Sequence, residues 1–275
     1  MELRHWAERI LSADTLEEKL FAPDELTDLA PGPAVFWNEP VRPVELRFHK
    51  HTRKDRLPKL REHDHPDKRA ACLHRFAGHE LLAVEMMAYA LIAFPEAPRA
   101  FRRGVAHTLR EEQEHVRLYV ERLKGFGVKL GDLPLYRHFW AYVPFLKDPI
   151  QYVSVLSLTF EMANLDFAPH YGASFAKHGD EESAALMQRI LDDEIGHVAF
   201  GCSWLKKLKG PEESTWDAWR AAVPERLPVT RTKGITFLEE HRRRAGVPEE
   251  WLAKLQVKED PAPVVRRPSL EICAP

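Results

Sequence analysis

The sequence predicts an all-α protein built around a four-helix bundle with one long crossover connection. Apolar residues recur every three or four positions over 67–94, 98–124, 149–177 and 181–209, which is the period of a helix with one buried face. Proline or glycine falls near the ends of these segments, where helices start and stop. Short turns separate the first segment from the second and the third from the fourth. The longer stretch 125–148 separates the two pairs, as in bundles with one long crossover.

The flanking segments differ in composition from these helices. Residues 1–66 contain one or two short helices and then a proline-rich arm, which we expect to pack on the bundle. A strand pair near Ala34–Trp37 and Val44–Phe48 is a further expectation. The division that follows is an N-terminal arm (1–66), the bundle (67–210) and a C-terminal extension with short helices (211–275).

Composition indicates a soluble protein of the cytoplasm. Of the 275 residues, 44% are hydrophobic and 30% charged, with a formal net charge of −2, so nothing favours binding to nucleic acid or to an anionic membrane. No run approaches the roughly 18 apolar residues of a transmembrane helix, and the charged start of the chain lacks a signal-peptide core. Three cysteines without a Cys-x-x-Cys pair indicate a reducing compartment.

Two copies of one short motif dominate the long helices. Glu112 precedes His115 by three residues, and Glu194 precedes His197 by three. Residues three apart lie on one face of a helix, one turn apart, so each pair can hold a metal ion together. Taken singly, such a pair is as well explained by a charged, exposed helix face. Two other Glu-x-x-His pairs, before residue 66, lie outside the long helices and are treated as chance occurrences.

The other two long helices each carry a carboxylate within an apolar run. Glu80 lies on the first and Glu161 on the third, 32 and 33 residues before Glu112 and Glu194. A buried lone carboxylate is costly unless it is paired or binds metal. One Glu from each of two helices plus Glu-x-x-His from the other two is the ligand set of di-metal four-helix bundles.

A second acid follows five residues after each of these two glutamates. Glu85 and Asp166 would point about 140° away from the ligand face of an ideal helix, so a hydrogen-bonded or solvent-facing acid is the simpler explanation. Glu85 is the better candidate for an extra ligand.

One acid also precedes each Glu-x-x-His pair. A ligating His commonly donates its other N–H to a carboxylate, so Asp193 is a candidate partner of His115, and Glu111 of His197. Tyr119, one turn past His115, is a candidate redox or hydrogen-bonding residue and equally an ordinary core tyrosine.

The segments around these ligands resemble the ferritin-like superfamily. Residues 80–84, 111–122 and 190–197 look like the ligand-bearing helices of bacterioferritin. More of the chain, roughly 65–250, resembles an uncharacterised bacterial family of ferritin-like proteins (a domain of unknown function), including the runs 94–103 and 233–246. The resemblance implies the fold and the metal ligands but no reaction.

The expected function is a di-iron oxidase or monooxygenase that activates O₂ and acts on a small organic substrate. Oxygen and imidazole ligands suit iron, with manganese or a mixed manganese–iron pair as alternatives. A ferroxidase or storage protein, a di-manganese peroxide-disproportionating enzyme, a tRNA-base hydroxylase and a metal-free bundle are the competing hypotheses. An electron donor is a further expected partner. A monomer or homodimer is expected, because the added arms would obstruct a closed cage.

Overall fold

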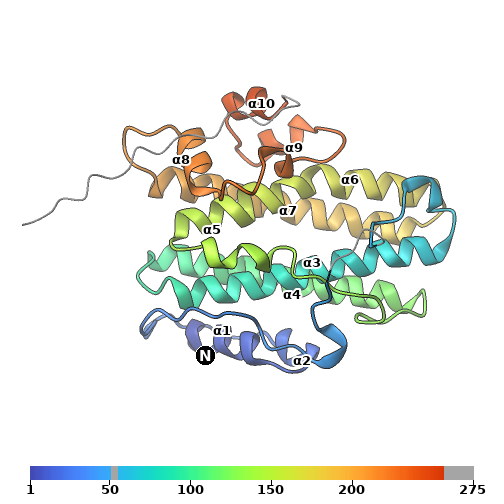
Figure 1. The fold of residues 1–275 in the computed structure, drawn as a ribbon, viewed down its shortest axis with the longest axis horizontal. Helices are drawn as coiled ribbons and strands as arrows, with labels where there is room; N and C mark the ends of the chain where they lie inside the picture. Colours follow the sequence, from blue (N-terminus) through green and yellow to red (C-terminus); the bar gives the residue numbers. More distant parts are fainter. Residues whose placement is uncertain (51–54, 257–275) are drawn as a thin grey trace, which may run out of the picture.

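The computed structural model describes residues 1–50 and 55–256 of the chain, and the regular secondary structure of this part is helical, as predicted (Figure 1). The expected strands at Ala34–Trp37 and Val44–Phe48 are wrong. Val44–Leu46 forms one 3₁₀ turn, and the described residues contain only isolated bridges, Glu2 with Thr27 and Phe48 with Leu135.

Four long helical stretches form the body of the molecule. Helix α3 (Pro66–Ala93) packs along α4 (Arg99–Lys124), and α6 (Met162–Lys177) packs along α7 (Glu181–Leu208). Contacts between α4 and α7 join the two hairpins. Residues 125–148 connect the two hairpins and include the 3₁₀ helix Trp140–Phe145 (Figure 1).

Local signals explain where these helices begin. Pro66 occupies the first turn of α3, where its missing N–H costs nothing. Asp148 caps α5 (Pro149–Val155) by accepting from the Gln151 amide, and Asp180 caps α7 by accepting from the Ser183 amide. The turn between α6 and α7 is closed by Gly179 at φ 75°, which glycine adopts without strain.

Between α5 and α6 the helix widens instead of continuing. Leu156–Glu161 is π-helical, and Glu161 is its last residue. Gly201 on α7 faces this segment so closely that a Cβ there would lie 2.6 Å from the Ser157 Cβ. Such single-turn π segments occur often at functional sites, and this one was not predicted from the sequence.

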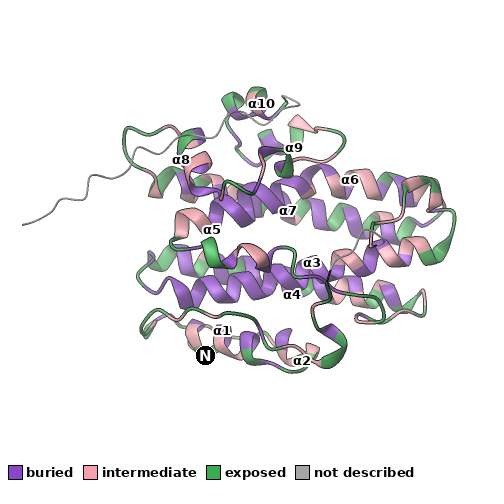
Figure 2. Cartoon of the chain, in the orientation of Figure 1, coloured by how far each residue is buried: buried purple, intermediate pink, exposed green. Residues whose placement is uncertain are grey.

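Most of helix α3 is buried (Figure 2). By length and composition it is apolar enough to cross a membrane, with a mean hydropathy of 1.3 over its most apolar 18-residue window. The remaining described helices do not meet this criterion. However, 89% of that window is buried inside the protein, which is the environment of a core helix in a soluble protein.

The N-terminal arm covers one side of the body. Helix α1 (Leu3–Ser12) packs on α3 and buries Trp6 and Ile10 completely, and α2 (Leu16–Lys19) follows it. The division of the chain at residues 66 and 210 remains a prediction.

The C-terminal segment covers the opposite side, over α5 to α7 (Figure 1). Its helices are α8 (Thr215–Ala222), α9 (Glu239–Arg244) and α10 (Glu249–Leu255). Trp216, Trp219 and Trp251 pack together with ring centroids 5.0 to 5.5 Å apart. Residues 257–275 of the predicted extension lie outside the described residues.

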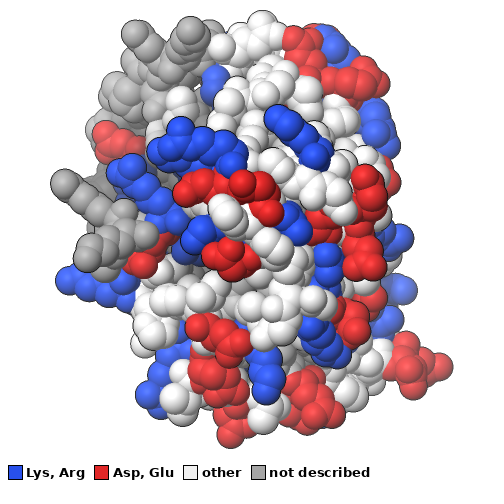
Figure 3. Space-filling view, turned by 90° about the vertical axis from the view of Figure 1, so that its right-hand side faces the viewer, with Lys and Arg blue, Asp and Glu red and all other residues white. Residues whose placement is uncertain are grey.

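The surface carries both signs of charge. Figure 3, which views the right-hand end of Figure 1, shows Lys and Arg interspersed with Asp and Glu. This mixture agrees with the net charge of −2. On this face no region of a single sign favours the binding of a polyanion.

Candidate metal centre

The six predicted ligands converge inside the body of the protein. Glu80 comes from α3, Glu112 and His115 from α4, Glu161 from the end of the π-helical segment, and Glu194 and His197 from α7. None of the six is more than 5% exposed.

Two groups of ligand atoms form within this set. One is Glu112, Glu161, Glu194 and His197, and the other is Glu80, Glu112 and His115. Within each group, every residue offers one ligand atom and these atoms lie within 4.8 Å of one another. Glu112 belongs to both groups, so its two carboxylate oxygens can face two ions.

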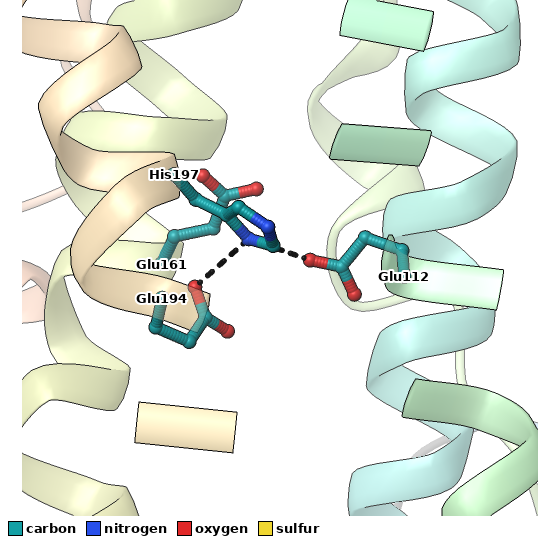
Figure 4. A group of neighbouring side chains, drawn as sticks. All are labelled: Glu112, Glu161, Glu194 and His197. Atoms are coloured by element: carbon teal, nitrogen blue, oxygen red, sulfur yellow. Dashed lines mark ion pairs between the residues drawn. The ribbon is translucent and has the colours of Figure 1, made fainter. Parts of the chain in front are cut away.

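Figure 4 shows how the first group is arranged across the core. Glu112 extends from α4 toward His197 and Glu194 on α7, with Glu161 behind them. The His197 Nδ1 lies 3.1 Å from Glu112 Oε1 and 3.5 Å from Glu194 Oε2. On the other side, His115 Nδ1 lies 3.4 Å from Glu112 Oε2. Both imidazoles therefore present Nδ1 to the cluster.

The opposite nitrogen of each imidazole contacts an acid on the partner helix. His115 Nε2 lies 3.1 Å from Asp193 Oδ2, and His197 Nε2 lies 3.1 Å from Glu111 Oε2. Both contacts are the predicted ones. An acid at Nε2 keeps a proton on that nitrogen, so Nδ1 is the nitrogen that becomes available to a cation once it has lost its own proton. The ligand tautomer is thus set by two reciprocal contacts between α4 and α7.

Beyond their contacts with one another, most of the inward-facing atoms make no hydrogen bonds. Both oxygens of Glu112, both of Glu161, Glu194 Oε2, and Nδ1 of His115 and His197 are buried and unpartnered. Buried carboxylate oxygens without partners are costly and rare. A pair of divalent cations would satisfy these atoms, so the residues present fit a di-metal site.

The pKa values show how the protein alone distributes this charge. Burial, reinforced by Glu112 and Glu194, raises the pKa of Glu80 well above its usual range. Burial raises the pKa of Glu161 to about 8, against the opposing effect of His197. Burial would lower the pKa of His115, but Glu112 and Asp193 raise it to about 9. Without cations, protons would therefore have to balance the carboxylates.

Two of the additional predicted residues lie away from the cluster. Glu85 is completely buried and pairs with Lys19 at 3.0 Å and with Arg42 at 2.5 Å. These two cations hold its carboxylate, and Glu85 belongs to neither group of candidate ligand atoms.

Asp166 serves the C-terminal segment. Its carboxylate accepts from Arg242, at 2.7 and 2.9 Å, and from the Gly234 and Leu238 amides. This supports the hydrogen-bonded explanation rather than a role at the ligand cluster.

Tyr119 lies against the cluster. It is buried, its hydroxyl lies 3.6 Å from Met187 Sδ, and burial together with Glu80 raises its pKa well above the usual value. It therefore stays in its neutral phenol form.

Sequence reasoning missed one polar neighbour of the ligands. Asn164 Nδ2 donates to Glu194 Oε1 at 2.7 Å. The sequence contained a pattern that could have indicated this residue. Asn164 follows Glu161 by three residues, which is the spacing found in the two Glu-x-x-His pairs.

Two adjoining cavities reach the cluster. The inner one, about 20 Å³, is lined in part by Glu80, Tyr119 and Asn164. The outer one, about 220 Å³, shares Asn164 and four other lining residues with it. A small molecule could thus approach Glu80 from the protein surface.

Comparison with known proteins places the chain in a family. Over 147 residues it is 28% identical to an uncharacterised protein of Haemophilus influenzae (strain ATCC 51907 / DSM 11121 / KW20 / Rd), covering 50% of this chain and 51% of that protein. The chain thus matches about half the length of this curated relative. No solved structure matches. A family model described as "Protein of unknown function (DUF455)" matches residues 3–253, and the chain therefore belongs to the DUF455 family.

Proposed function

We propose that the protein is a di-metal carboxylate oxidoreductase with a ferritin-like four-helix bundle, which uses iron and O₂ to oxidise a small organic substrate. One observation carries this proposal: two groups of buried, unpartnered ligand atoms share Glu112. A carboxylate common to two sites holds two cations close together, as in di-metal carboxylate bundles.

The donor set favours a hard or borderline metal. Carboxylate oxygen and imidazole nitrogen suit Fe(II) or Mn(II), whereas soft thiolate sites need cysteine. An iron pair, when bound, supplies electrons and coordination positions for the reduction of O₂. Manganese or a mixed pair is the alternative occupant.

The protein's own residues would orient the ligands and exclude water. Asp193 and Glu111 hold the Nε2 protons of His115 and His197, so Nδ1 stays available. The apolar surroundings keep bulk water from the cluster, and charge interactions are stronger there than in solution. Tyr119, as a neutral phenol beside Glu80, can donate a hydrogen bond.

Iron storage in a closed cage is the competing function, and the fold argues against it. The N-terminal arm and the C-terminal segment cover opposite sides of the long helices (Figure 1), where a cage would need bare helix surface. We propose a monomer or homodimer in the cytoplasm, with a small-molecule electron donor or a donor protein. Light scattering tests this, because a cage would appear as a very large particle.

Metal content with an oxygen-dependent signal tests the proposed function. Protein purified without chelator is analysed for metal, then reduced, loaded with Fe(II) anaerobically and exposed to O₂. We expect two metal ions per chain and an optical change that requires O₂. Peroxide disproportionation by a manganese-loaded form would instead indicate the catalase-like alternative.

A matched pair of variants makes the measurement specific to the shared ligand. Glu112→Gln should lose both ions, because its carboxylate serves both groups. Glu114→Gln removes an exposed acid two residues away that pairs with Arg117, and should keep both. Failure of the wild-type protein to take up iron or manganese would refute the proposal.

A further inference from the structure

The outer cavity is a chamber connected to the candidate metal centre. Five residues line both cavities: Phe76, His79, Asn164, Phe167 and Tyr171. The inner cavity continues to Glu80. A molecule in the outer chamber would therefore have one end directed at the ligand cluster and the other at the surface.

The walls of this chamber are largely aromatic. Phe139 and Phe160 stack with ring centroids 4.4 Å apart and an interplanar angle of 18°. Phe76 and Tyr171 meet edge to face at 4.8 Å. All four line the chamber, and such flat surfaces favour a planar ring as guest.

The charge at the chamber is positive. Arg75 and Arg231 line it, and no Asp or Glu is among its lining residues. Arg75 is engaged, with its guanidinium 4.4 Å from the Tyr136 ring centroid and a hydrogen bond to the Asp55 carbonyl. The Asp55 side chain is hydrogen-bonded to the phenol of Tyr136.

Arg231 is the cation positioned for a ligand. It lies on the 3₁₀ turn Val229–Thr232, and its side chain donates to His138 Nε2 at 2.6 Å. It makes no ion pair with an acid in the described part of the chain. Its planar fork of donors matches a carboxylate.

We propose that this chamber binds a small aromatic carboxylate, with the carboxylate on Arg231 and the ring extending between the aromatic walls toward Glu80. The binding itself depends only on the chamber. That the inward edge of the ring is the reacting end rests on the proposed function.

The test compares two probes of nearly equal shape. Binding of 4-fluorobenzoate and of 4-fluorobenzyl alcohol to the full chain is measured by ¹⁹F NMR. Wild-type protein should bind the carboxylate more tightly, and Arg231→Gln should weaken its binding about tenfold, since a hydrogen bond to a charged group is lost. Binding of the alcohol should not change, which also shows that the variant is folded.

A second arginine provides the control for net charge. Arg244→Gln removes an exposed guanidinium that lies 3.8 Å from Asp192, away from the chamber, and should leave both affinities unaltered. The proposal is overturned if wild-type protein does not bind 4-fluorobenzoate, prefers the alcohol, or loses no affinity in Arg231→Gln.

Loading with Mn(II) separates this proposal from the proposed function. Bound 4-fluorobenzoate should show strong ¹⁹F relaxation enhancement in the Mn(II)-loaded protein and none after chelation. Carboxylate-selective binding without any metal uptake would support the chamber and refute the metal centre. Metal uptake without selective binding would refute the chamber alone. Selective binding without enhancement in Mn(II)-loaded protein would refute the orientation toward Glu80.

Discussion

Substitution of Glu161 by Gln should have opposite effects on stability and on metal binding. Both carboxylate oxygens of Glu161 are buried, and burial raises its pKa from 4.5 to about 8. Glu161→Gln removes the ionisable group but keeps the side-chain shape. It should therefore stabilise the metal-free protein and weaken metal binding, a combination that a merely structural glutamate would not give.

The magnitude follows from the linkage between protonation and folding. Between pH 4.5 and about 8 the unfolded chain has Glu161 ionised while the folded chain keeps it protonated. The folded state binds more protons, so raising the pH lowers the free energy of unfolding by about 1.4 kcal/mol per pH unit in this window. At pH 7 the accumulated loss is about 3 kcal/mol, which Glu161→Gln would recover.

Urea unfolding of chelator-treated protein at pH 5 and pH 7 measures this effect. The variant should exceed the wild type by less than about 1 kcal/mol at pH 5 and by about 3 kcal/mol at pH 7. Metal content of the untreated proteins gives the second readout. The reasoning is refuted if the variant retains full metal, or if it is destabilised equally at both pH values.

Three further substitutions test other parts of the structure. Asp193→Asn should reduce metal affinity about 10- to 100-fold with little change in stability, because the imidazole of His115 loses the acid that fixes its tautomer. Equilibrium dialysis measures this affinity, and an unchanged value would contradict the prediction. Lys19→Met should lower the free energy of unfolding by about 3 kcal/mol, because Glu85 loses a buried partner. Metal content should stay constant, and a loss of metal would indicate that Glu85 contributes to metal binding. Gly201→Ala should destabilise by about 1–3 kcal/mol and weaken metal binding by displacing the π-helical segment, whereas Gly196→Ala, on the same helix with nothing within 4 Å of its new Cβ, should do neither.

The sequence was sufficient where helical spacing decides the outcome. The positions of Glu112, His115, Glu194 and His197 follow from a three-residue period on a helix. The contacts of Asp193 and Glu111 with these histidines follow because the two Glu-x-x-His motifs lie at the same level along two facing helices. These contacts were therefore predictable from residue order alone, as was the all-helical class. The metal itself remains a proposal.

The sequence was insufficient where packing between distant segments decides. Glu85 forms ion pairs with Lys19 and Arg42, which lie on the N-terminal arm. Asp166 forms an ion pair with Arg242, which lies on the C-terminal segment. No local pattern specifies such pairs.

The π-helical segment likewise depends on a close approach between helices. Gly201 on α7 closely approaches Ser157 and Leu158. Residues 156–161 read alone are compatible with an ordinary helix. The expected strands failed because local β propensity is weak without a sheet to join.

If the protein binds two metal ions as proposed, the distribution of the candidate ligands between the two hairpins predicts an order of assembly. Glu80, Glu112 and His115 all lie on the α3–α4 hairpin, so this half carries one complete group of ligands by itself. The other group takes Glu161, Glu194 and His197 from the second half but needs Glu112 from the first. During synthesis the N-terminal hairpin could bind a cation before the C-terminal hairpin emerges. The second position would form only when the halves dock, so its occupation would lock the two hairpins together.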